Sequence, residues 1–162
     1  MIQRIQTIFL FLAFLAAIAL FFYPIAGIYA ELVAYKFYVY GFKNMVPGEA
    51  SHFSFMTTFP LLLLNILVAV LSVFCIFQYK NRVRQAKLVR LAILLEIILI
   101  VLVLFVYANI IEKNLFTSPV YIEKDRIING VYFPLITLIF LILANWAILR
   151  DEKLVRSADR LR

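Results

Sequence analysis

Four stretches of the chain consist almost entirely of apolar residues, and each is long enough to cross a bilayer. A helix rises about 1.5 Å per residue, so about 20 apolar residues span a hydrocarbon core. The alternation of apolar and polar residues that marks an outer-membrane β-strand is absent from these stretches. The pattern predicts an all-α membrane protein, with four transmembrane helices bundled in one domain of residues 1–162. The expected helices cover about Ile5–Tyr23, Phe55–Phe77, Leu91–Ile110 and Tyr132–Leu149.

The composition also indicates a membrane protein. Of the 162 residues, 65% are hydrophobic, whereas a soluble domain is roughly 45–50% apolar. The first apolar stretch follows Arg4 in the manner of a secretory signal, but it is too long and too aromatic for one. We therefore expect it to be retained. Cys75 is the only cysteine, so no intrachain disulfide can form.

Basic residues are distributed unequally over the segments between the apolar stretches. If both ends and the loop 78–90 lie on one side, that side holds eleven Lys and Arg, against five on the other. Short loops rich in Lys and Arg stay in the cytoplasm. We therefore expect both termini, the loop 78–90 and the tail 150–162 to be cytoplasmic. The loops 24–54 and 111–131 are then external.

This topology also accounts for the net charge of +7. The excess of positive charge falls on the cytoplasmic segments, whereas the external loops are close to neutral. Topology therefore explains the charge better than nucleic-acid binding does, and no nucleic-acid partner is expected.

The first external loop is expected to contain a β-strand. Residues 31–43 are rich in β-branched and aromatic side chains, and an extended chain there places Tyr35, Phe37 and Val39 on one face. The alternative is that these aromatic residues form an interfacial belt on an irregular loop.

The second external loop offers a further strand. Asn129 and Gly130 stand between two apolar dipeptides, which is a tight-turn signal. Because an isolated hairpin is marginally stable in water, the two external loops would gain stability by pairing with each other.

Both ends of the chain resemble a known family. The start MIQRIQTIFLFL and the end DEKLVRSADRLR are similar to the signatures of small four-helix inner-membrane proteins of the Bacteroidota, a family described as a domain of unknown function. The resemblance covers the whole chain and implies a multi-pass protein of a bacterial inner membrane. It implies no activity and no catalytic residue.

Glu96 is the most conspicuous polar residue within the apolar stretches. It lies six residues after Arg90, about 9 Å along the third expected helix. A carboxylate there is costly and often marks an ion or proton pathway. Counted from the nearest basic residues, Asn145 and Ser72 lie at comparable depth, which predicts an intramembrane polar layer of these three residues. Three interpretations stay open: a hydrogen-bonded acid that joins helices or docks a partner, a group on an ion path, and a snorkelling side chain.

Other polar residues give weaker signals. Asn65 and Thr137 are expected to help pack helices. His52 is expected to be an ordinary interfacial residue, and Trp146 to anchor the inner interface. No phosphate-binding loop, nucleophile triad or metal-ligand spacing appears. We therefore expect no enzyme activity, no cofactor and no metal.

The charged tail 150–162 can continue the fourth helix. It then carries a narrow apolar stripe with helical spacing beside basic residues. Such a helix suits a groove on a partner protein or the headgroup layer of anionic lipids, or it serves only to set topology. The three acidic residues of the tail favour the partner over a purely electrostatic anchor. The residues expected to contact a partner or lipid are Arg82, Arg84, Lys87, Arg90, Lys153, Leu154, Arg156, Ala158, Arg160, Leu161 and Arg162.

These features favour a non-catalytic accessory or assembly subunit that lies in the lipid bilayer and binds a larger inner-membrane complex or further copies of itself. The alternative is a small oligomeric transporter or channel that uses Glu96. An enzyme that acts on lipid or quinone ranks behind both. Transport requires Glu96 to meet water or another polar path, whereas a docking subunit can bury it against a partner.

Overall fold

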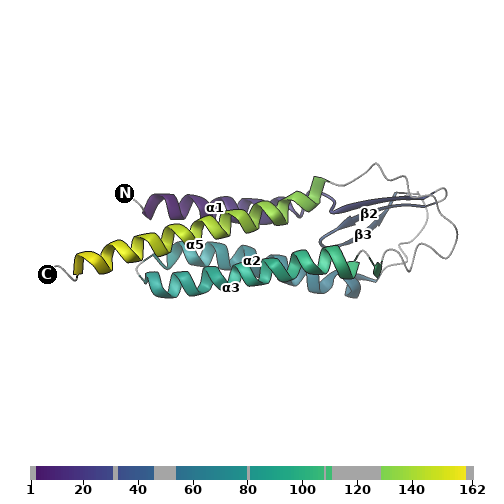
Figure 1. Cartoon of the computed structure of the whole chain (residues 1–162). Helices are drawn as coiled ribbons and strands as arrows, with labels where there is room; N and C mark the ends of the chain where they lie inside the picture. The colour runs from purple at the N-terminus through teal and green to yellow at the C-terminus, as the bar shows by residue number, and fades with distance from the viewer. Residues whose placement is uncertain are drawn as a thin grey trace.

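Four long helices and one small sheet make up most of the computed structural model, which describes residues 3–30, 33–45, 54–79, 81–107, 109–110 and 129–159. The helices lie side by side (Figure 1), and the sheet lies at the end opposite to both ends of the chain. The predicted helical protein with β-strands in an interhelical loop is therefore confirmed at this level.

Helix α2 (Phe55–Phe77) has the bounds that the apolar pattern predicts. The hydroxyl of Ser54 accepts a hydrogen bond from the backbone N–H of Met56 at 3.4 Å, which satisfies one of the free donors at a helix start. Pro60 lies in the second turn.

Helix α3 (Arg82–Val101) begins nine residues earlier than expected. The side chain of Asn81 accepts the backbone N–H of Arg84 at 3.2 Å and caps the helix start. The following Arg, Gln, Lys and Leu residues are good helix formers, so the polar segment before Leu91 is helical as well. The helix continues as a π-helix, η1 (Leu102–Tyr107).

Helix α5 (Tyr132–Asp159) runs ten residues beyond the expected end at Leu149. The tail therefore continues the fourth helix through Asp159, as predicted. A short 3-10 helix, η2 (Asn129–Val131), leads into α5, so the prediction of a hairpin turn at this position is wrong. Residues 111–128, where the second external strand was expected, lie outside the described residues.

Helix α1 (Gln3–Ala19) is shorter than the first apolar stretch. After Ala19 the chain forms turns of the 3-10 type, because the backbone N–H groups of Phe21 and Phe22 donate to carbonyls three residues back, each at 3.0 Å. Among the residues that the structure describes, three helical segments are long and apolar enough to cross a membrane, which suggests a membrane protein. They are Phe55–Phe77, Arg82–Tyr107 and Tyr132–Val155.

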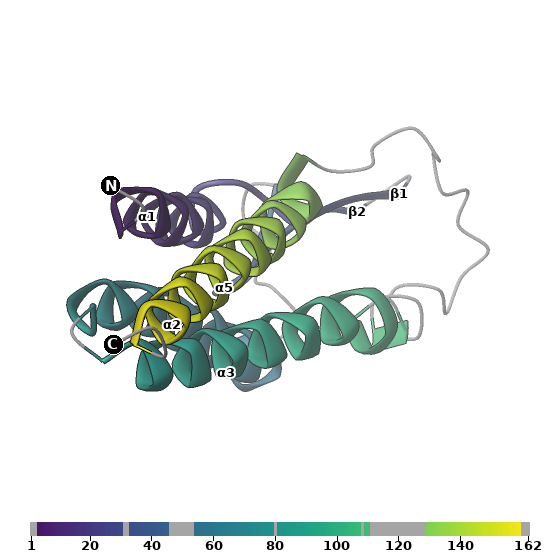
Figure 2. The ribbon, with the colours of Figure 1, turned by 60° about the vertical axis from the view of Figure 1, so that its left-hand side comes forward.

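Each helix packs on two antiparallel neighbours, in the cyclic order α1, α2, α3 and α5 (Figures 1 and 2). The interior toward the chain termini holds a cluster of buried apolar residues from all four helices. Many of them are small, among them Ala13, Ala86, Ala92 and Ala144. Small side chains let helix backbones approach closely, and dispersion contacts then hold the bundle together.

An antiparallel sheet of β1 (Ala26–Ala30), β2 (Val33–Tyr38) and β3 (Gly41–Asn44) closes the other end. All three strands come from the first interhelical loop. They pair consecutively, with Gly27 opposite Lys36 and Phe37 opposite Phe42.

One face of the sheet packs on the helices. Tyr35, Phe37 and Val39 are at most 1% exposed, which confirms that they share a buried face. Phe37 stacks on Tyr107 of η1, with ring centroids 5.2 Å apart. The hydroxyl of Tyr107 donates to the carbonyl of Thr57 on α2 at 2.6 Å, so η1 joins the sheet to the bundle.

Candidate functional site

A hydrogen bond between α2 and α3 sets the relative heights of their residues. Nε2 of Gln85 donates to the carbonyl of Cys75 at 2.9 Å. The two helices are antiparallel and rise equally per residue, so a step along one matches an equal step back along the other. Glu96 is eleven residues after Gln85, and Asn65 is ten before Cys75. Glu96 and Asn65 therefore lie at about one level.

The contact between α3 and α5 places Thr137 at this level too. Arg82 pairs with Asp151, and both Glu96 and Thr137 lie fourteen residues from that pair. Asn65, Glu96 and Thr137 are each only 1% exposed. Because all three are buried at one height of a four-helix bundle, they share its interior. We call these three residues the mid-bundle polar layer.

Two members of the layer are bonded to backbone. Nδ2 of Asn65 donates to the carbonyl of Ala17 on α1 at 3.1 Å. The hydroxyl of Thr137 donates to the carbonyl of Phe133, one turn back, at 2.9 Å. Oε2 of Glu96 is buried without a hydrogen-bond partner among the described residues. A buried polar atom without a partner is costly, so Glu96 is the member of the layer with unused bonding capacity.

The structure does not bring Ser72 and Asn145 to Glu96. By the same counting both are level with Leu88, eight residues and about 12 Å from Glu96 along α3. The hydroxyl of Ser72 donates to the carbonyl of Val68 in its own helix at 2.8 Å. The expected depth of Glu96 was counted from the last basic residue before the apolar stretch, whereas α3 itself begins two turns earlier.

An ion pair joins α3 to α5 at the end that holds the chain termini. Nη1 of Arg82 lies 3.2 Å from Oδ2 of Asp151, but the angles there are not those of a hydrogen bond. The same Nη1 donates to the backbone carbonyl of Asp151 at 3.3 Å. Nearby, Nε2 of Gln6 on α1 donates to the carbonyl of Ala147 at 3.2 Å. Asp151 therefore stabilises helix packing, a role that its charge alone does not indicate.

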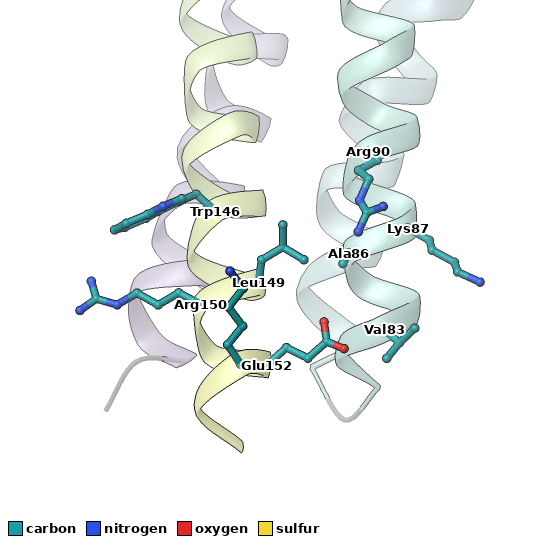
Figure 3. Close-up of a pocket in the computed structure, with 9 residues that line it drawn as sticks. Val83, Ala86, Lys87, Arg90, Trp146, Leu149, Arg150 and Glu152 are labelled. Atoms are coloured by element: carbon teal, nitrogen blue, oxygen red, sulfur yellow. The ribbon is translucent and has the colours of Figure 1, made fainter. Parts of the chain in front are cut away.

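A groove of about 560 Å³ lies between α3 and α5 at this end. Four of its lining residues are basic and one, Glu152, is acidic. In Figure 3, Arg90 and Glu152 point into the gap between the helices, whereas Trp146 and Arg150 extend from the other side of α5. We call it the basic groove. Its lining residues are Val83, Ala86, Lys87, Arg90, Trp146, Leu149, Arg150, Glu152 and Lys153.

Only some of the predicted contact residues line this groove. Lys87, Arg90 and Lys153 do so, whereas Arg82 is held in the ion pair and Arg84 is exposed outside it. Leu154 is 50% exposed on α5. The side chains of Arg156 and Ala158 lie outside the described residues, as do Arg160, Leu161 and Arg162.

Two contributors to this groove were not among the predicted contacts. Trp146 was expected to be an interfacial anchor, and Arg150 to be one of the basic residues beside the apolar stripe of the tail. The guanidinium carbon of Arg150 lies 5.4 Å from the centroid of the Trp146 ring, which is a cation–π distance. Their spacing of four residues on a helix was the signal for this contact.

A comparison with protein families finds one match over nearly the whole chain. The family is described as "Domain of unknown function (DUF4293)", and its model matches residues 2–161. No curated protein and no solved structure gives a match.

Proposed function

The chain belongs to the DUF4293 family, and we propose that it is a non-catalytic accessory or assembly subunit of a larger bacterial inner-membrane complex. In this proposal all four helices cross the membrane and both termini are cytoplasmic. The unequal distribution of basic residues supports the orientation. The apolar surface supports the location, because large hydrophobic side chains on every helix are exposed.

The observation that carries the docking proposal is the projecting end of α5. Asp151 holds α5 to α3, and beyond it α5 extends past the other helices (Figure 1). Leu154 and Val155 are 50% and 43% exposed on this projecting part. A helix that presents apolar side chains among charges is suited to the groove of a partner protein.

Removing Leu154 to Arg162 should release the partner and leave the bundle folded. The deleted segment follows Asp151, so the contacts within the bundle remain. Quantitative mass spectrometry of complexes from native membranes should find a protein lost from the truncated chain. The double variant Leu154→Ser, Val155→Ser should weaken the same association, whereas Ser157→Ala, an exposed neighbour, should not. Retention of every partner by the truncated chain would exclude docking through this segment.

Cysteine labelling should report the C-terminal end of α5 on the inside and the sheet on the outside. In a Cys75→Ala background, Ser157→Cys should react with a membrane-impermeant maleimide only after the cells are lysed, when the reagent reaches the cytoplasmic face of the membrane. Lys43→Cys, at the exposed position of β3, should react in intact spheroplasts. The reverse pattern would show that the orientation is inverted.

The mid-bundle polar layer favours a second candidate function, a small oligomeric transporter or channel. Glu96 has an oxygen without a hydrogen-bond partner in the part of the chain that the structure describes. It lies in the bundle interior, where an ionisable group commonly marks an ion or proton path. Neutral replacement of this carboxyl by Glu96→Gln distinguishes the two functions.

A further inference from the structure

We propose that the basic groove between α3 and α5 binds the headgroup of an anionic phospholipid. The inference rests on the membrane placement in the proposed function and not on any protein partner. It assigns a ligand class to a surface that the docking proposal leaves unused.

Charge is the first argument. Lys87 and Arg90 on α3 and Arg150 and Lys153 on α5 line the groove with one acid, Glu152. Residues of both helices therefore give the groove a lining with three net positive charges. Arg90 points into the gap, whereas Arg150 lies at its outer edge on the other side of α5 (Figure 3). Basic pockets between transmembrane helices at the cytoplasmic face commonly hold phosphate-bearing headgroups. Arginine and lysine supply the donors that a phosphate oxygen accepts.

The apolar part of the groove selects a lipid over a small soluble anion. Val83, Ala86 and Leu149 line it together with the basic residues. Further from the chain termini, Leu91 on α3 and Ile142 on α5 are 46% and 49% exposed. A phospholipid whose phosphate lies at the basic residues can therefore lay its acyl chains along apolar helix surface.

Trp146 indicates that the groove lies at the membrane boundary. The residue is 59% exposed, and its ring lies under the Arg150 guanidinium. Trp residues concentrate at the headgroup level of bilayers. The ring also lines a smaller hollow of about 240 Å³ with Ile5 and Phe9 of α1, so lipids can approach α5 from two sides.

Trp146 also provides the measurement, because it is the only tryptophan of the chain. The full-length protein is reconstituted into vesicles of phosphatidylcholine in which a fraction of the lipid is brominated, as phosphatidylglycerol or as phosphatidylcholine. Bromine quenches tryptophan fluorescence on contact. Brominated phosphatidylglycerol should quench Trp146 more strongly, and the preference should fall as salt is raised.

The preference should fall about fivefold for each basic side chain removed from the groove. Lys87→Gln with Arg90→Gln should therefore lower it about 25-fold. Arg84→Gln is the matched control, because Arg84 carries the same charge on the same helix outside the groove. Lys153→Gln repeats the test from α5 if the double variant does not fold.

Each other outcome overturns the inference. Equal quenching by both brominated lipids in the unmodified protein excludes a selective headgroup site. An equal loss in Arg84→Gln indicates general surface attraction and no groove. Inorganic phosphate should not reduce the preference more than sulfate of equal ionic strength does, and a greater reduction would assign the groove to free phosphate. If neither brominated lipid quenches Trp146, the membrane placement itself is wrong.

Discussion

Gly130→Ala is expected to destabilise the fold by about 3 kcal/mol. The backbone between α1 and β1 passes directly over Gly130, whose N–H donates to the carbonyl oxygen of Pro24 at 3.1 Å. A Cβ on Gly130 would clash with that oxygen and would lie 2.6 Å from the carbonyl carbon of Pro24 and 2.9 Å from Cα of Ile25. These are backbone atoms, so they cannot rotate away.

The displaced start of α5 would then lose its contact with the segment that follows α1. Tyr23 and Phe133 stack there with ring centroids 5.0 Å apart. Unfolding by sodium dodecyl sulfate in mixed micelles, followed by circular dichroism, measures the change in free energy. Gly41→Ala is a comparison without the clash, because its added Cβ meets no atom within 4 Å; its φ of +159° is one that side chains rarely adopt, so a backbone cost of at least about 1 kcal/mol is expected there. Equal stability of Gly130→Ala and the unmodified protein would contradict the close approach.

Glu96→Arg is expected to cost about 3 kcal/mol or more, whereas Glu96→Gln should cost no more than about 1 kcal/mol. Glu96 is 1% exposed, and fourteen residues of α3, about 21 Å, separate it from Arg82. A permanently charged arginine at this position could not reach the bundle end, and the nearby buried residues Ala92 and Leu99 leave it no room. Glutamine keeps the shape and a hydrogen-bonding oxygen. The same detergent titration measures both variants.

Glu96→Gln also separates the two candidate functions. A docking subunit should keep its partners, because the amide can replace the acid in any hydrogen bond. A proton-coupled transporter should lose proton movement in vesicles that carry a pH-sensitive dye, because glutamine cannot take up a proton. Loss of partners without a change in proton movement would argue that the carboxyl itself contacts the partner. A glutamine variant as unstable as the arginine variant would show that the layer requires the acid.

The apolar pattern determined the helices of this protein. Long runs of apolar residues are helical because backbone groups away from water must bond within the segment, and α2 follows the pattern at both ends. The strand at residues 33–38 was also predictable, because alternating aromatic and β-branched residues need one buried face. Helical tail residues were predicted from their spacing.

Helix ends in polar segments were not determined in this way. Arg, Gln and Lys are common both in loops and in solvated helix turns, so hydropathy marks only the apolar part of α3. The helix begins nine residues earlier than hydropathy indicates. Glu96 therefore lies at the level of Asn65 and Thr137, and not at the expected level of Ser72 and Asn145. The members of the polar layer therefore depend on helix register, which is set by contacts between helices.

Close approaches between distant segments were decided by the tertiary structure alone. Asn129 and Gly130 have the local signature of a hairpin turn, but the glycine is where the backbone at Pro24 crosses the start of α5. Asp151 has the local signature of a solvated tail residue, but it forms an ion pair with Arg82 on the neighbouring helix α3. The sequence by itself determined which segments are helices and which side chains are costly to expose. Only the packing of those helices decided which of these side chains contact one another, because a local pattern contains no information on residues that lie far apart along the chain.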